Sequence, residues 1–127
     1  MSFDEKGRYY HNDTSYSLVK KASIKIPYEY FLGILNSKLM WFFLSQTGNV
    51  VRGGYFRFKT RYLEPVSIPI LEKKEIDIVI KEVEKILEKK QKSPTADTTA
   101  LEHQIDELVY KIYGLTEEEI AIVEGKN

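Results

Sequence analysis

The 127-residue sequence predicts an α+β fold, in which a small β-element with a buried helix is followed by an antiparallel helical hairpin. Aromatic and β-branched residues are concentrated at 8–26 and 55–70, as in strands. Residues 28–46 are apolar on most sides, which indicates a buried helix. After residue 70, apolar residues recur every three or four positions, as in paired helices. The prediction divides the chain into residues 1–70 and residues 71–127.

The first unit should contain short strands around one long helix. Residues 8–26 are expected to be extended, with a turn at 11–15. A strand at 55–59 would be aromatic on one face and mostly basic on the other, and Pro69 makes 66–70 an edge strand or a strand end. The helix is expected to run from 28 to 46, after Pro27 and before Gly48 as a left-handed cap.

The second unit carries two heptad-like seams, which either pack on each other or dock on a partner helix. The first seam comprises Ile76, Ile80, Val83 and Leu87. The second seam comprises Leu101, Ile105, Leu108, Ile112 and Leu115. Capping boxes are expected at Thr99 with Glu102 and at Thr116 with Glu119. Gly114 and Gly125 are expected to end the two helices that these boxes begin.

Composition excludes several classes of protein. The chain has no cysteine, so it has no disulfide, thiolate metal site or cysteine nucleophile. No stretch reaches the roughly 18 apolar residues of a membrane span, and we expect a cytoplasmic protein without membrane association. Residues 1–70 contain ten Lys/Arg and five Asp/Glu, whereas residues 71–127 contain nine Lys and fourteen Asp/Glu. The basic first half suggests a polyanionic partner.

The sequence offers no set of residues that would form one catalytic site. His11 lies in a predicted turn beside Asp13, with no nucleophile nearby, and His103 lies on a charged helical stretch, where solvent exposure is expected. The acids at 117–119 suit the first turn of a helix. Phosphate-loop, dinucleotide and metal-ligand spacings do not occur. We therefore expect no catalytic residue, metal site or cofactor in this chain.

One segment has the composition of a nucleic-acid contact. Within ten residues that include no acid, basic side chains alternate with aromatic ones and follow two glycines. Arginine and lysine neutralise phosphates, and glycine lets a backbone approach a phosphate closely. The alternative is an ordinary amphipathic strand with a solvated basic face. The candidate DNA-binding residues are Arg52, Gly53, Gly54, Tyr55, Arg57, Lys59 and Arg61.

The order of several short motifs resembles the TaqI-like C-terminal specificity domain of N6-adenine DNA methyltransferases and single-chain restriction-modification enzymes. The motifs are Leu-Asn-Ser-Lys-Leu at 35–39, Arg-Gly-Gly-Tyr-Phe-Arg-Phe at 52–58, Tyr-Leu-Glu-Pro at 62–65 and Ile-Pro-Ile at 68–70. The tail at 107–120 is similar to the closing segment of those proteins. A comparable order occurs in the specificity subunits of type I restriction systems, and the likeness covers about residues 9–124.

The resemblance implies a non-catalytic DNA target-recognition module, with residues 1–70 as the C-terminal part of the recognition domain and residues 71–127 as a spacer or docking hairpin. It implies that Arg52, Arg57, Lys59 and Arg61 face DNA while Phe56 and Phe58 pack inward. The family's catalytic Asn/Asp-Pro-Pro-Tyr motif is missing, since the chain contains no Pro-Pro. We therefore expect a fragment, with the first recognition subregion upstream.

Cofactors and partners follow from the same resemblance. S-adenosylmethionine, with Mg²⁺ as a second candidate, is expected in the parent protein and not in this chain. The expected partners are double-stranded DNA and the parent's methyltransferase or nuclease core, with self-association through exposed helices as a further candidate. The alternative function is a protein-interaction module that joins such a core without reading bases.

Overall fold

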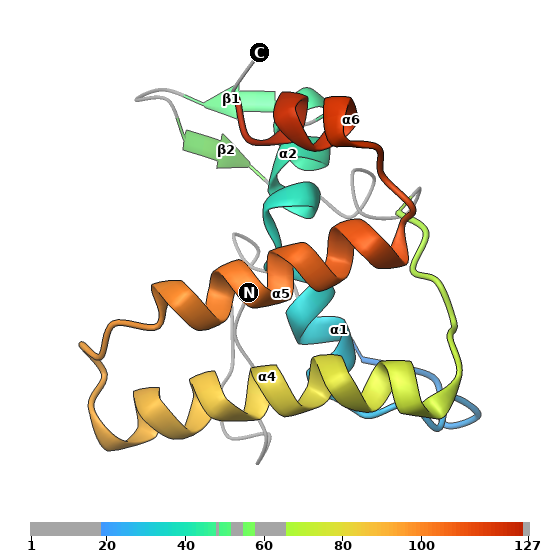
Figure 1. The fold of residues 1–127 in the computed structure, drawn as a ribbon, viewed down its shortest axis with the longest axis vertical. Coiled ribbons are helices and arrows are strands. Elements are labelled where there is room, and N and C mark those ends of the chain that lie inside the picture. Colours follow the sequence, from blue (N-terminus) through green and yellow to red (C-terminus); the bar gives the residue numbers. More distant parts are fainter. Residues whose placement is uncertain (1–18, 48, 52–54, 58–65, 126–127) are drawn as a thin grey trace.

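The computed structural model describes residues 19–47, 49–51, 55–57 and 66–125, with side chains at 19–46 and 66–125. Five helices and two short strands follow one another in this part of the chain (Figure 1). They are α1 (Tyr28–Leu35), α2 (Lys38–Thr47), β1 (Asn49–Val51), β2 (Tyr55–Arg57), α4 (Lys73–Lys92), α5 (Thr99–Ile112) and α6 (Glu117–Val123). None of the helices in the described residues is long and apolar enough to cross a membrane.

The predicted α+β class is wrong, because helices dominate the described residues. The strands there are three residues each and form one antiparallel ladder, β1–β2. Residues 19–26 hold a turn in place of a strand, with the Ile24 N–H donating to the Lys21 carbonyl at 2.9 Å. Residues 19–26, the described part of the first predicted strand region, are therefore not extended.

The predicted strand at 66–70 is also wrong. Residues 66–72 form an irregular link into α4. Two tyrosine hydroxyls hold this link: Tyr30 donates to the Pro69 carbonyl at 2.6 Å, and Tyr113 donates to the Ser67 carbonyl. Val66 and Ile68 pack against the core. The apolar residues that suggested a strand are thus explained by packing, and side chains satisfy carbonyls that a strand would have paired with backbone.

The long helix predicted at 28–46 is two helices, α1 and α2. The break falls at Asn36 and Ser37. The Ser37 hydroxyl donates to the Ile34 carbonyl at 2.7 Å and accepts the Met40 N–H at 3.3 Å. Serine therefore closes one helix and caps the next, which is a conformation that competes with a continuous helix.

A single hydrophobic core joins the two halves of the chain. Tyr30 and Ile34 of α1 are fully buried against Val79 of α4 and Val109 of α5. α4 and α5 lie side by side in opposite directions, and α1 crosses them (Figure 1). Because α4 packs on both α1 and α5, its buried side chains spread beyond the predicted seam, and Leu87 at the far end is 39% exposed. The division at residue 70 stays a prediction.

The turns that separate the last helices were partly predicted. Thr116 and Glu119 form the expected capping box at α6, and Gly114 and Gly125 have positive φ angles of 68° and 72°. The box expected at Thr99 and Glu102 is wrong. The N-cap of α5 is Thr98, with no side-chain cap, and the Asp97 carboxylate accepts both the N–H and the hydroxyl of Thr99.

Candidate nucleic-acid interface

The predicted DNA-binding residues are placed by the structure only in part. Tyr55 and Arg57 begin and end β2, whose backbone pairs with β1 at Val51↔Tyr55 and Asn49↔Arg57. Their side chains, together with Arg52, Gly53, Gly54, Lys59 and Arg61, lie outside the described residues, as do Phe56 and Phe58. The antiparallel register places Val51 opposite Tyr55, and the glycine pair lies between these two residues in the sequence.

A second basic segment lies within the described residues and was not singled out from the sequence. Residues 19–25 contain Lys20, Lys21 and Lys25 and no acid. Lys21 and Lys25 are exposed. Lys20 is held in place, because its ammonium donates to the Ile24 carbonyl at 3.1 Å and lies 5.2 Å from the centroid of the Tyr28 ring. The signal was available in the sequence, as three lysines without a nearby acid.

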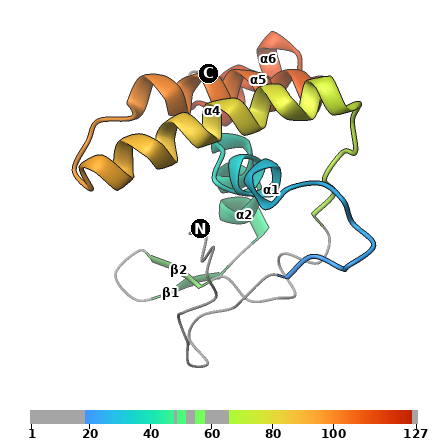
Figure 2. The same cartoon turned by 90° about the horizontal axis from the view of Figure 1, so that it is seen from below.

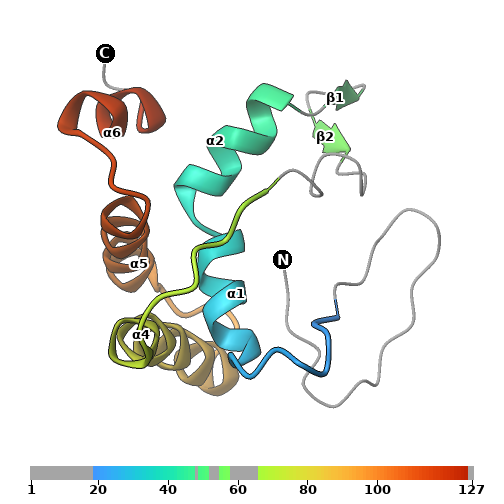
Figure 3. The ribbon, with the colours of Figure 1, turned by 90° about the vertical axis from the view of Figure 1, so that its right-hand side faces the viewer.

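Strands β1 and β2 lie on the same side of the molecule as residues 19–25. Figures 2 and 3 show β1 and β2 and the segment that precedes α1 on one side of α1 and α2, with α4 and α5 on the other side. In that other layer, α4 and α5 together contain eight lysines and eight Asp/Glu, so they carry no net charge. Residues 19–25 carry three lysines and no acid, so a polyanion would be attracted to the side on which they lie.

Asp106 holds the first residue of α2. Its carboxylate accepts the N–H of Lys38, the first residue of α2, at 2.8 Å from across the core. An acceptor at this position satisfies a helix N–H that would otherwise have no partner. Burial raises the pKa of Asp106, while the hydrogen bond from the Lys38 N–H and the positive charge of the Lys38 side chain act to lower this pKa. The Leu-Asn-Ser-Lys-Leu motif thus contains the break between α1 and α2 and the residue that Asp106 holds.

The tyrosines that anchor the link at 66–72 remain neutral donors. Burial raises the pKa of both Tyr30 and Tyr113. Each hydroxyl therefore keeps its proton and donates to a backbone carbonyl at neutral pH. These two bonds connect the end of the first half of the chain to α1 and to the C-cap of α5, two of the helices that form the core.

An open groove lies where α1 and α2 meet the layer of α4 and α5. It has a volume of about 920 Å³ and runs between α1, α2, α4 and α5. Trp41, which is 53% exposed, and Leu87 line it with Leu32 and Ile86. His103 also lines the groove and is exposed, as the sequence led us to expect. The groove is the described surface that best suits a protein partner.

Comparison with known families identifies the first half of the chain. A family model for the TaqI-like C-terminal specificity domain matches residues 1–70. The chain belongs to this family. The matched span includes α1, α2, β1 and β2, so the resemblance is confirmed there, whereas the tail at 107–120 lies beyond it. Comparison with curated proteins and with solved structures finds no match.

Membership in the TaqI-like specificity domain family supports a coarse role. A specificity domain serves DNA recognition in restriction-modification enzymes and is itself non-catalytic. That role agrees with the expectation that this chain is not an enzyme. The family match therefore favours DNA recognition over catalysis.

Proposed function

We propose that this chain is the DNA target-recognition module of an adenine-specific DNA methyltransferase or of a fused restriction-modification enzyme. Family membership over residues 1–70 is the observation that carries the proposal. The placement of β1, β2 and residues 19–25 on the side away from α4 and α5 supports it (Figure 3). S-adenosylmethionine and Mg²⁺ belong, in this proposal, to the catalytic core of the parent and not to this chain.

DNA binding would combine phosphate contacts with base contacts. Arg52, Arg57, Lys59 and Arg61 are proposed to contact DNA, and Gly53 and Gly54 would allow a close backbone approach. Lys21 and Lys25 would extend the phosphate contacts along the same side. Arginine can also distinguish guanine by two parallel hydrogen bonds, so Arg52 and Arg57 are the candidates for base reading.

The test is fluorescence anisotropy of the 127-residue chain with a labelled duplex of random sequence. Binding by several phosphate contacts should weaken by orders of magnitude between about 50 and 200 mM salt. Replacing Arg52 and Arg57 with alanine should lower the slope of log K against log salt by about 2 if both contact phosphates. A double variant with unchanged affinity and slope would remove these two arginines from the interface.

The second candidate function is a docking module for a methyltransferase or nuclease core, without base reading. The groove with Trp41 and Leu87 favours it, because exposed apolar side chains that line a concave surface are typical of protein contacts. Sedimentation of the chain would distinguish the two functions. Self-association together with a lack of DNA binding at low salt would favour docking over recognition.

A further inference from the structure

Three side chains with metal-ligating atoms meet where α6 returns towards α5. His103 and Glu107 lie one turn apart on α5, and Glu124 is the C-cap of α6. Their ligating atoms all lie within 4.8 Å of one another, and His103 Nε2 is 3.8 Å from Glu107 Oε1. A spacing of four residues places His103 and Glu107 on the same face of the helix. The third group comes from a separate helix, so folding brings the set together.

The chemistry of the set selects one class of cation. An imidazole nitrogen with two carboxylate oxygens suits Zn²⁺ and related transition-metal ions, whereas Mg²⁺ and Ca²⁺ prefer oxygen ligands alone. Ligands at Zn²⁺ distances in tetrahedral geometry are about 3.4 Å apart. His103 and Glu107 have side chains that are 59% and 57% exposed, so rotation about their χ angles can close the difference.

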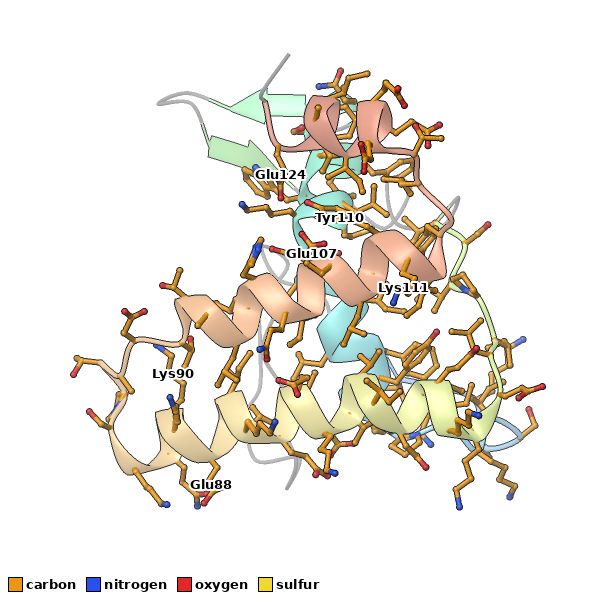
Figure 4. The ribbon with its side chains drawn as sticks, in the orientation of Figure 1. Glu88, Lys90, Glu107, Tyr110, Lys111 and Glu124 are labelled. Atoms are coloured by element: carbon orange, nitrogen blue, oxygen red, sulfur yellow. The ribbon has the colours of Figure 1, made fainter. Side chains whose placement is uncertain are left out.

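An outer hydrogen bond orients the carboxylate of Glu124. The hydroxyl of Tyr110 donates to Glu124 Oε1 at 3.3 Å, and Tyr110 itself is 1% exposed. Figure 4 shows Glu107, Tyr110 and Glu124 around the space between α5 and α6. Burial and the nearby carboxylate raise the pKa of Tyr110, so the hydroxyl stays protonated as a donor. Hydrogen bonds of this kind hold ligating side chains in metal sites.

The surrounding charge also favours a cation. Residues 97–124 contain eight Asp/Glu and one Lys. Asp106, next to Glu107 in the sequence, is buried and interacts electrostatically with both His103 and Glu124. An excess of negative charge on α5 and α6 raises the local concentration of divalent cations. A bound cation would partly neutralise this charge and so stabilise the protein.

We propose that His103, Glu107 and Glu124 bind a divalent transition-metal ion of the zinc class and so fasten α6 to α5. Three protein ligands leave a fourth position for water or for a group from a partner. The site lies on α5 and at the end of α6, and it includes no residue of the proposed DNA surface. Its occupancy would favour the folded arrangement of α6, because the ligand set is complete only when α6 is packed.

The test is calorimetric titration of the chelator-treated 127-residue protein with ZnCl₂, followed by the absorption spectrum of the Co²⁺ form. One saturable site is expected. His103→Ala and Glu124→Gln should each weaken it by roughly a hundredfold, since loss of a ligand should cost no less than loss of an outer contact. His11→Ala, which removes the other histidine, and Glu102→Gln, which removes a neighbouring charge, are matched controls and should bind as the unmodified chain does.

Hydrogen exchange gives a second measurement that does not depend on the affinity. Zn²⁺ should slow exchange at the amides of α6 in the unmodified chain and leave them unchanged in Glu124→Gln. Circular dichroism checks that each variant folds, and Glu107→Gln replaces any that does not. The absence of a saturable site would overturn the proposal, as would equal affinities of His103→Ala and the His11→Ala control.

Discussion

Replacing Asp106 tests how α2 is held in the fold. Asp106 is 6% exposed, and its carboxylate accepts the Lys38 N–H at the start of α2. Asp106→Ala removes this acceptor and leaves a helix N–H without its partner. Loss of a cap costs about 1 kcal/mol, within a range of about 0.5–2 kcal/mol. Asp106→Asn keeps a carbonyl oxygen in the same place and should keep most of the stability.

The charge of Asp106 adds a pH dependence with a definite sign. Burial raises the pKa of Asp106 in the folded protein above its ordinary value, so the folded state binds the proton more tightly than the unfolded state does. The resulting stabilisation is fully present below the unfolded pKa of about 3.9 and is lost as the pH rises through the folded pKa. Asp106→Asn has no such proton. The stability of the unmodified chain relative to Asp106→Asn should therefore increase as the pH falls from neutral.

Thermal and urea unfolding, followed by circular dichroism, measure these differences. At pH 7 Asp106→Ala should unfold about 4 °C earlier for each kcal/mol lost. Asp77→Ala, which removes an exposed aspartate from α4, is the matched control and should change stability by less than about 0.5 kcal/mol. Equal losses of stability in Asp106→Ala and Asp106→Asn would show that the hydrogen bond to Lys38 is not the important contact.

Three further substitutions test the packing and the turns of the fold. Gly33→Ala would place a Cβ 2.9 Å from Val83 Cγ2. The cost of overpacking, about 1–3 kcal/mol of folding stability, should exceed the gain in helix propensity of about 1 kcal/mol. A rise in Tm would contradict this contact. Thr116→Ala removes half of the capping box with Glu119 and should cost about 1 kcal/mol, visible first as faster hydrogen exchange in α6. Gly114→Ala should cost about 1 kcal/mol in urea unfolding, because its φ of 68° is unfavourable for a side chain; an unchanged midpoint would argue against that conformation.

Local signals in the sequence were the dependable ones. The capping box at Thr116 and the glycine at position 114 were predicted because the residues that determine them lie within one turn. The capping box at Thr99 was predicted wrongly because Asp97, which also lies close in the sequence, accepts the Thr99 N–H in place of Glu102. The extent of helical structure at the end of the chain followed from apolar spacing alone.

Features that depend on distant residues were missed. The apolar pattern continues across Asn36 and Ser37, so nothing in it shows the break between α1 and α2. The N–H that begins α2 is satisfied by Asp106, which lies 68 residues away in the sequence. The apolar residues of the link at 66–72 suggested a strand, but Tyr30 of α1 and Tyr113 at the end of α5 bind two of its carbonyls. Such contacts have no local sequence pattern.

The candidate site was predicted unevenly. The arginine-glycine segment was singled out by composition and by family resemblance, and the family is confirmed while the residue roles remain predictions. The lysines at 20, 21 and 25 were visible in the sequence, but their significance depends on which side of α1 and α2 they lie. The set formed by His103, Glu107 and Glu124 depends on the return of α6, so its members could not be grouped in advance.

We propose that DNA binds on the side opposite α4 and α5. The most direct measurement compares two charge-matched double variants, Lys21→Gln with Lys25→Gln and Lys81→Gln with Lys89→Gln, in duplex binding across a range of salt. All four lysines are exposed, and the second pair lies on α4. We predict that the first pair lowers the slope of log K against log salt by about 2, while the second pair leaves affinity and slope unchanged. Equal losses from both pairs, or a loss from the α4 pair alone, would contradict the claim.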